Sequence, residues 1–453
     1  MAIARMDELL RDPYGVNYQD TLQLMELESL EYFRRQKAQI QALQIQCAKR
    51  DVPDIPQSLH DLVGALFTHS SYKSYPERWL RDGEWAKMNR WLGRISAIQP
   101  TCNVSTVQTL DDWLDVLRTD DLRVTHSSGT TGKPSLFPRT VHEVEMFGKN
   151  LERGLADFFP IRSGEGLPAF VGSFEDGYNV FVLGFNAMAR SFGHPNHTYF
   201  LFPGKLGAEQ ARQGAIMKYK YMHGELDPIQ ANQYEEMAKK QQQMMEKVFT
   251  NFVETMAKYK GQKVFFGMGA AQAFAVASIG LKKGYEELFS EQSVMLTGGG
   301  LKGAQLPADY MKQIYEFTGI PEHHHTDTFG MTECNSVATE CPEYRNKHIQ
   351  PWLQPMVLDR EASELLNSDG KVTGRWAFID PIAVNYWGGI VTGDLVTVDF
   401  SGCDCGRHGP VLIGEIKRYT DLKGVDEDKL SCMAQLNEYL MSDVGGSASE
   451  LLF

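Results

Sequence analysis

The segment from Ser127 to Lys133 combines residue types that suit the binding of a polyphosphate. It consists of Ser127, Ser128, Gly129, Thr130, Thr131, Gly132 and Lys133. Glycines let backbone N–H groups approach a ligand closely, hydroxyls are further donors, and lysine supplies a positive charge. The segment is not a Walker loop, because two residues rather than four separate the glycines and Pro134 follows the lysine. The combination of Thr-Thr, Lys and Pro after a β-like segment favours a phosphate-binding loop over a flexible linker.

A second glycine-rich turn and an isolated aspartate occur further along the chain. The turn follows a strand-like segment at 294–297 and consists of Gly298, Gly299 and Gly300. Glycine there permits close approach to a flat base or an acyl group, although most such turns are structural. Asp394 comes just after another strand-like segment, where its carboxylate could accept hydrogen bonds from ribose hydroxyls.

A hydroxyl and a carboxylate stand next to each other in the segment 327–333. Thr332 directly precedes Glu333, a pairing that suits a phosphate contact beside a Mg²⁺ ligand. The alternative is a strand end that caps a helix through Thr332. Taken alone, these two residues do not decide between the alternatives.

Short apolar segments alternate with helical ones through the middle of the chain. The strand-like segments are 169–172, 198–202, 264–267 and 294–297, and the helical ones include 144–158 and 178–191. This alternation predicts an α/β fold with a largely parallel sheet flanked by helices. We expect a helical part over 1–108, an α/β ATP-binding core over 109–358, a β-rich subdomain over 359–420 and a short segment over 421–453.

The polar stretch 208–260 interrupts the alternation and has a helical pattern. It could be a lid or a surface for a protein partner, but such segments are more often solvated helical hairpins.

Composition limits the classes of function. The 453 residues carry a formal net charge of −13, which argues against a nucleic-acid partner. The apolar stretch 265–281 is too short to cross a bilayer comfortably and contains Gln272. The N-terminus has acidic residues where a signal peptide would be apolar. We therefore expect a cytoplasmic protein whose seven cysteines are thiols or metal ligands.

The order of the motifs resembles the adenylate-forming superfamily of acyl-CoA synthetases, peptide-synthetase adenylation domains and luciferases. The resemblance covers about residues 120–425 and rests on Ser-Ser-Gly-Thr-Thr-Gly-Lys-Pro, Gly-Gly-Gly, Phe-Gly-Met-Thr-Glu and Thr-Gly-Asp in that order. Ser135 and the Cys-Asp-Cys-Gly-Arg segment at 403–407 are most similar to phenylacetate–CoA ligases and acyl-protein synthetases. The resemblance implies the large N-terminal lobe of that superfamily. Few residues follow Asp421, so the C-terminal lobe is expected to be absent or vestigial.

The resemblance also implies roles for individual residues. Ser127 to Lys133 would line the pyrophosphate loop, and Gly298 to Gly300 would flank adenine and the acyl substrate. Thr332 would contact the α-phosphate, Glu333 would bind Mg²⁺, and Asp394 and Arg418 would contact ribose. Lys133, Thr332 and Glu333 would then be the catalytic residues.

The implied function is ATP-dependent activation of a carboxylic acid as an acyl-adenylate, with release of pyrophosphate. The acyl group would then pass to a thiol, either of CoA or of a protein cysteine or carrier, or to another nucleophile. The alternative is a nucleotide-binding partner subunit of a multienzyme complex with reduced catalysis. If the C-terminal lobe is absent, efficient adenylation is the point to test.

Cysteine placement raises two separate hypotheses. Cys341, His348, Cys403 and Cys405 would supply the one imidazole and three thiolates of a closed, structural Zn²⁺ site, similar to an arrangement in some phenylacetate–CoA ligases. The alternative is ordinary buried cysteines and an exposed histidine. Cys432, in a helix-like segment near the C-terminus, is either an acyl carrier, as in acyl-protein synthetases, or an inert packing residue.

Overall fold

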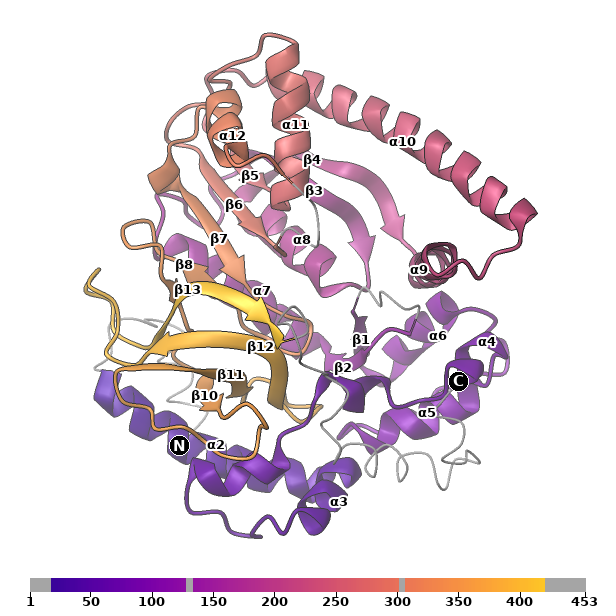
Figure 1. Cartoon of the computed structure of the whole chain (residues 1–453), viewed down its shortest axis with the longest axis vertical. Helices are drawn as coiled ribbons and strands as arrows, with labels where there is room; N and C mark the ends of the chain where they lie inside the picture. Colours follow the sequence, from indigo (N-terminus) through magenta and orange to yellow (C-terminus); the bar gives the residue numbers. More distant parts are fainter. Residues whose placement is uncertain (1–17, 128–132, 301–305, 420–453) are drawn as a thin grey trace.

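The N-terminal part of the protein is helical. The computed structural model describes residues 18–127, 133–300 and 306–419, and Figure 1 shows their arrangement. The helices here are α2 (Tyr18–Gln39), α3 (Gln41–Lys49), η1 (Leu59–Ala65), η2 (His69–Lys73), α4 (Glu77–Arg81), α5 (Trp85–Arg94), α6 (Leu110–Val116) and η3 (Leu117–Asp120). Three tryptophans of this part, Trp79, Trp91 and Trp113, are fully buried. Trp91 and Trp113 each donate their indole N–H to a neighbouring polar side chain, whereas the indole N–H of Trp79 has no hydrogen-bond partner among the described residues.

A two-stranded antiparallel hairpin follows the helical part. Its strands are β1 (Leu122–His126) and β2 (Leu136–Thr140), and the register pairs His126 with Leu136. The glycine-rich segment is therefore the connection between these two strands. Helix α7 (Val141–Ala156) begins directly after β2 with a capping box formed by Thr140 and Glu143.

The parallel half of the main sheet has the order β7-β6-β5-β3-β4. Its strands are β3 (Leu167–Gly177), β4 (Gly193–Leu206), β5 (Phe265–Gly267), β6 (Val294–Gly298) and β7 (His325–Phe329). Helices α7 and α8 (Val180–Phe192) cover one face, and α10 (Pro228–Ala257), α11 (Ala270–Lys282) and α12 (Tyr310–Thr318) cover the other. Consecutive strand residues point to opposite faces of the sheet. Phe265 packs on the face that α7 and α8 cover, and Phe266 packs on the face that α10, α11 and α12 cover. Burial on both faces explains the continuous apolar runs of these strands.

The other half of the sheet is antiparallel and continues from β7 without a break. The order is β10-β11-β12-β13-β9-β8-β7, which completes an 11-stranded sheet. The strands are β8 (Ala338–Glu340), β9 (Lys347–His348), β10 (Gln354–Leu358), β11 (Lys371–Ile379), β12 (Gly389–Asp399) and β13 (Val411–Arg418). Strands β8 to β10 precede residue 359, so antiparallel structure begins earlier in the chain than the sequence pattern indicated. The pattern missed β8 and β9 because they have three and two residues, too few to show a period.

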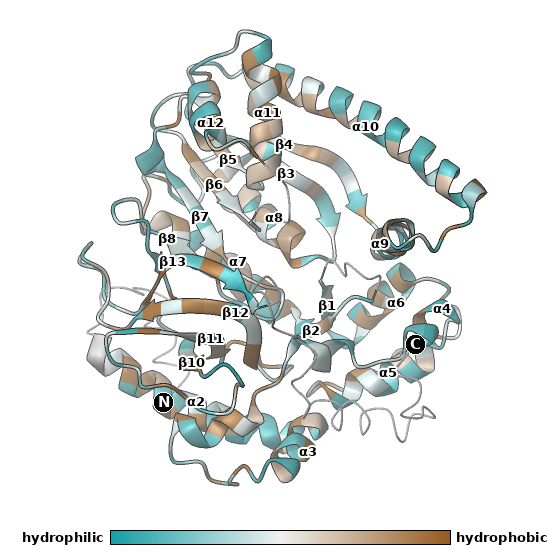
Figure 2. Cartoon of the chain, in the orientation of Figure 1, coloured by the Kyte–Doolittle hydropathy of each residue, from teal (hydrophilic) through white to brown (hydrophobic). Residues whose placement is uncertain are grey.

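Residues 208–260 contain a helical hairpin of α9 (Ala208–Met222) and α10. Asp227 caps α10 by accepting hydrogen bonds from the backbone N–H groups of Ile229 and Gln230. Only the last turns of α10 reach the core, through Phe252, Val253 and Met256. Figure 2 shows the rest of the helix mainly in hydrophilic colours, away from the sheet. In the part of the chain that is described, no helix is both long and apolar enough to span a membrane.

Candidate active site

The two ends of the glycine-rich loop are held together by hydrogen bonds. The backbone N–H of Ser127 donates to the carbonyl of Ser135 at 3.1 Å, and the N–H of Ser135 donates to Oγ of Ser127 at 3.0 Å. Tyr75 donates its hydroxyl to the carbonyl of Pro134 at 2.5 Å. The Ser127 hydroxyl therefore closes the base of the loop. Ser128, Gly129, Thr130, Thr131 and Gly132 lie outside the described residues, so their roles stay predictions.

Lys133 lies at the end of the loop and packs against an aromatic ring. Its Nζ is 5.4 Å from the ring centroid of Tyr75. Burial lowers the pKa of the Lys133 ammonium to about 8, an effect that Lys73 strengthens and Glu77 opposes. This lysine is therefore easier to deprotonate than a solvated one.

The second glycine-rich turn stands at the carboxyl end of β6. A Cβ on Gly298 would lie 2.7 Å from Oγ1 of Thr328 on the neighbouring strand, which is too close for any other residue to fit without displacing Thr328. Gly299 and Gly300 have φ values of 78° and 58°, in the left-handed region that favours glycine. The turn thus places three consecutive residues without side chains at this edge of the sheet.

Thr332 and Glu333 follow β7, the strand next to β6. They occupy a turn that begins at the same edge of the sheet as the glycine turn. Burial raises the pKa of the Glu333 carboxyl, and the nearby carboxylate of Asp394 raises it further, whereas Arg418 and Arg139 lower it. Glu333 is therefore electrostatically linked to Asp394 and Arg418, although these residues are far apart in the sequence.

Asp394 and Arg418 form an ion pair across two neighbouring strands. The register pairs them on β12 and β13, and Arg418 Nε lies 3.0 Å from Asp394 Oδ1. Asp394 is buried, whereas Arg418 is more than half exposed. Burial raises the pKa of Asp394, and Arg418 is the strongest of the groups that oppose the rise. The pair thus presents a buried carboxylate beside an exposed guanidinium close to Glu333.

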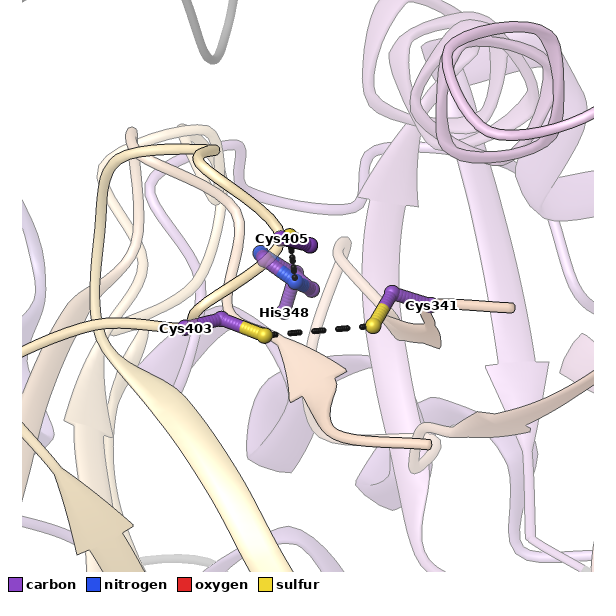
Figure 3. A group of neighbouring side chains, drawn as sticks. All are labelled: Cys341, His348, Cys403 and Cys405. Carbon is purple, nitrogen blue, oxygen red and sulfur yellow. Dashed lines mark hydrogen bonds between the residues drawn. The ribbon is translucent and has the colours of Figure 1, made fainter. Parts of the chain in front are cut away.

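A separate group of metal-ligating side chains lies where β8, β9 and the β12–β13 connection meet. The ligand atoms of Cys341, His348, Cys403 and Cys405 are all within 4.8 Å of one another. Cys341 Sγ is 3.9 Å from Cys403 Sγ, and Cys405 Sγ is 3.4 Å from His348 Nε2 (Figure 3). A tetrahedral Zn²⁺ site with bonds of about 2.3 Å to sulfur and 2.0 Å to nitrogen has S–S edges of about 3.8 Å and S–N edges of about 3.5 Å. The Cys341–Cys403 and Cys405–His348 distances are close to these edges, and the whole side chain of His348 is buried rather than exposed.

Burial shifts the pKa values of His348 and Cys403 in this Cys/His cluster toward the neutral forms of both side chains. Burial lowers the pKa of His348 to about 4, with a further contribution from Arg407, so the imidazole is neutral and able to ligate near neutral pH. Burial raises the pKa of the Cys403 thiol to about 11, and the neighbouring cysteines add to the rise. A metal that binds here must therefore displace protons from thiols.

The structure also brings residues to the site that the sequence motifs did not indicate. Arg139 on β2 is almost fully buried and donates a hydrogen bond to the carbonyl of Thr332, and the hydroxyl of Tyr386 donates to the carbonyl of Glu333. One signal was present in the sequence, since an arginine interrupts the otherwise apolar run at 136–139. No comparable signal marks Tyr386.

Comparison with known proteins identifies the fold. No family model and no curated protein matches the sequence. Among solved structures, 2-hydroxyisobutyryl-CoA ligase in complex with 2-HIB-AMP and CoA matches with a TM-score of 0.55 and 14% identity, over 90% of this chain and 70% of the ligase. The same ligase in the postadenylation state matches with a TM-score of 0.54 and 12% identity, over 93% of this chain and 74% of the ligase. This chain therefore has the fold of an adenylate-forming acyl-CoA ligase.

Proposed function

We propose that this protein activates a carboxylic acid with ATP, forms an acyl-adenylate and releases pyrophosphate. The acyl group then passes to a thiol, either of CoA or of a protein cysteine or carrier, or to another nucleophile. The observation that carries the proposal is that Glu333, Asp394 and Arg418 come together from two halves of one sheet. This sheet belongs to a fold that the chain shares with a ligase that binds an acyl-AMP.

The proposed reaction is an attack by a substrate carboxylate oxygen on the α-phosphorus of ATP. A new P–O bond forms, and the bond between the α-phosphorus and pyrophosphate breaks. Both reactants are anionic, so the site has to align them and to neutralise the departing charge. Lys133 and the hydroxyls of the glycine-rich loop would bind pyrophosphate, and Thr332 would donate to the α-phosphate. Glu333 would hold Mg²⁺, whose charge supplies further stabilisation.

Two features of the site fit these assignments. Oxygen ligands are those that Mg²⁺ prefers, and the raised pKa of Glu333 indicates a carboxylate that gains stability from a nearby cation. Asp394 and Arg418 offer one acceptor and one donor side by side, which suits the vicinal hydroxyls of ribose.

One observation favours the alternative, a nucleotide-binding partner subunit with reduced catalysis. The ammonium of Lys133 packs on the Tyr75 ring, and burial brings its pKa to about 8. With this pKa the amine is still mostly protonated at pH 7, but an ammonium that stays on the Tyr75 ring is held by that contact rather than by pyrophosphate. The two functions differ in whether any carboxylic acid supports turnover.

Exchange of labelled pyrophosphate into ATP, measured across a panel of carboxylic acids, separates the two functions. We expect at least one acid to support exchange, and Lys133→Ala and Glu333→Ala to abolish it. ATP binding without exchange for every acid would instead establish the partner-subunit alternative.

We propose in addition that Cys341, His348, Cys403 and Cys405 hold a structural Zn²⁺ ion. Four protein ligands leave no open position for a substrate, so the ion would not take part in adenylation. It would fix the β12–β13 connection to β9 and to the end of β8, the strand that pairs with β7. The helical hairpin at 208–260 remains a prediction as a surface for a protein partner.

A further inference from the structure

Arg139 is a charged residue in an interior where charge is costly. It belongs to β2, whose five residues are all buried, and only 1% of its surface is exposed. Removing a guanidinium from water carries a large desolvation cost, and apolar replacements of buried charges are often neutral or stabilising. A packing role alone therefore does not account for an arginine at this position.

The guanidinium holds the turn that contains Thr332 and Glu333. Its Nη2 donates to the carbonyls of Thr332 at 2.7 Å and Cys334 at 3.2 Å, and its Nε donates to Oδ1 of Asn335 at 2.6 Å. The carbonyl between these two accepts from the hydroxyl of Tyr386 at 3.1 Å. Two buried side chains thus bind the three consecutive carbonyls of residues 332–334.

The same guanidinium also reaches the hairpin that carries the glycine-rich loop. Its Nη1 donates to Oγ1 of Thr125 on β1, and Thr125 is two residues before Ser127. Because Arg139 itself stands on β2, it touches both strands of the hairpin. One rigid, planar group therefore links the hairpin to the 332–334 turn.

The charge of Arg139 is not used in a direct ion pair. Among the ion pairs of the described residues, none involves Arg139, and its partners are carbonyls, an amide oxygen and hydroxyls. It nevertheless lowers the pKa of three carboxyls around it, those of Glu143, Glu333 and Asp380. The arrangement depends on the planar guanidinium with its five N–H donors, a geometry that lysine lacks.

We infer that Arg139 is a positioning residue, which together with Tyr386 fixes Thr332 and Glu333 relative to the β1–β2 hairpin at the base of the glycine-rich loop. The inference rests on the proposed function, in which the loop binds pyrophosphate and Thr332 and Glu333 act at the α-phosphate. In-line displacement requires these two groups to keep a fixed separation, and a displacement of about 1 Å can cost about 100-fold in rate. Arg139 touches neither reactant; it acts through the backbone of the turn.

The test uses the full-length protein with Arg139→Met, Arg139→Lys and Tyr386→Phe. Arg212→Met is the matched control, because Arg212 is also a buried arginine but pairs with Glu209 on α9, away from the 332–334 turn. In pyrophosphate exchange we expect Arg139→Met to lower kcat about 100-fold while KM for ATP changes less than threefold. Arg139→Lys should recover part of kcat, because an ammonium can still donate to one or two of the carbonyls. An unchanged kcat in the folded Arg139→Met variant, or an equal loss in Arg212→Met, would overturn the inference.

Amide hydrogen exchange at Cys334 and Asn335 gives a second readout that needs no turnover. These N–H groups donate to the carbonyl of Met331 and the carboxylate of Asp380. Loss of the clamp, meaning the hydrogen bonds of Arg139 and Tyr386 to the carbonyls of residues 332–334, should speed their exchange at least about tenfold. Tyr386→Phe tests the same point if Arg139→Met does not fold. Unchanged exchange in both Tyr386→Phe and Arg139→Lys contradicts the clamp. If wild type supports no pyrophosphate exchange but the amides respond as expected, the proposed reaction fails and the clamp stands.

Discussion

Removal of the proposed Zn²⁺ ion from the Cys/His cluster should destabilise the protein by an amount that can be calculated. The four ligands come from three separate segments, namely the end of β8, strand β9 and the β12–β13 connection. None of these segments can supply the whole site when the chain is unfolded, so the metal binds the native state preferentially. At a free concentration a thousand times the dissociation constant, such a ligand adds about 4 kcal/mol of stability.

The expected shift in melting temperature is modest because the chain is long. At about 2.1 cal/mol/K per residue, 453 residues give an unfolding entropy of about 0.95 kcal/mol/K, so 4 kcal/mol corresponds to about 4 °C. The assay is calorimetry on protein prepared without chelator, before and after treatment with a strong chelator, together with elemental analysis. We expect one equivalent of zinc before treatment and none after it. Co²⁺ reconstitution should give the visible absorption of a tetrahedral thiolate site.

Cys403→Ser and Cys102→Ser form a matched pair for this experiment. Both positions are half-buried cysteines, but Cys102 lies near Asn89, outside the cluster. Cys403→Ser should lose the metal and melt like the chelated wild type, whereas Cys102→Ser should keep it. Wild-type protein without stoichiometric zinc, and with a melting temperature that neither chelator nor Cys403→Ser alters, would refute the reasoning.

Three further changes test the site and its surroundings. Asp394→Asn should raise KM for ATP about tenfold in pyrophosphate exchange, since it weakens an acceptor proposed for ribose by about 1.4 kcal/mol, close to the lower end of the range for hydrogen bonds to charged groups; an unchanged KM would remove Asp394 from the nucleotide site. Gly298→Ala places a Cβ 2.7 Å from Thr328 Oγ1, so we expect a loss of about 1–3 kcal/mol in urea unfolding, and Gly214→Ala, where the added Cβ meets nothing within 4 Å, is the control. His325 has its pKa lowered from 6.5 to about 3 by burial, with help from Arg345 and Lys347. Between pH 3 and 6.5 this imidazole therefore binds more protons in the unfolded protein than in the folded one. The free energy of unfolding falls as the pH is lowered through this window, by about 2 kcal/mol at pH 5. Urea titrations at pH 7 and pH 5 should show that His325→Gln loses correspondingly less, and equal losses in both proteins would contradict the assignment.

The parallel half of the sheet was predictable because its strands are apolar on both faces. Phe265 and Phe266 pack into different clusters, so a run of apolar residues is required there and its position is visible in the sequence. The antiparallel half was predictable only where its strands are long, as in β11 and β12. Strands β8 and β9 are fixed by their neighbours rather than by their own pattern.

The candidate site was predictable to the extent that its chemistry lies in local motifs. The glycine turn at 298–300 and the Thr332–Glu333 pair are motifs of that kind. Arg139 and Tyr386 are not, because their partners lie far away in the sequence and become neighbours only when the hairpin meets the sheet. The ion pair of Asp394 and Arg418 likewise depends on the register of β12 and β13, which sequence patterns do not specify.

The order of strands in the sheet has a consequence for how the chain folds as it is synthesised. Strand β13, the last strand of the described chain, lies between β12 and β9 within the antiparallel half and connects β10, β11 and β12 to the rest of the sheet. Until residue 418 has left the ribosome, β9 and β12 both present unpaired edges. Such edges are prone to pair with other chains, and closing contacts of long sequence separation is slow. Nascent chains that stop before β13 should therefore depend on chaperones, and a pause after β12 should be more harmful than one after β7.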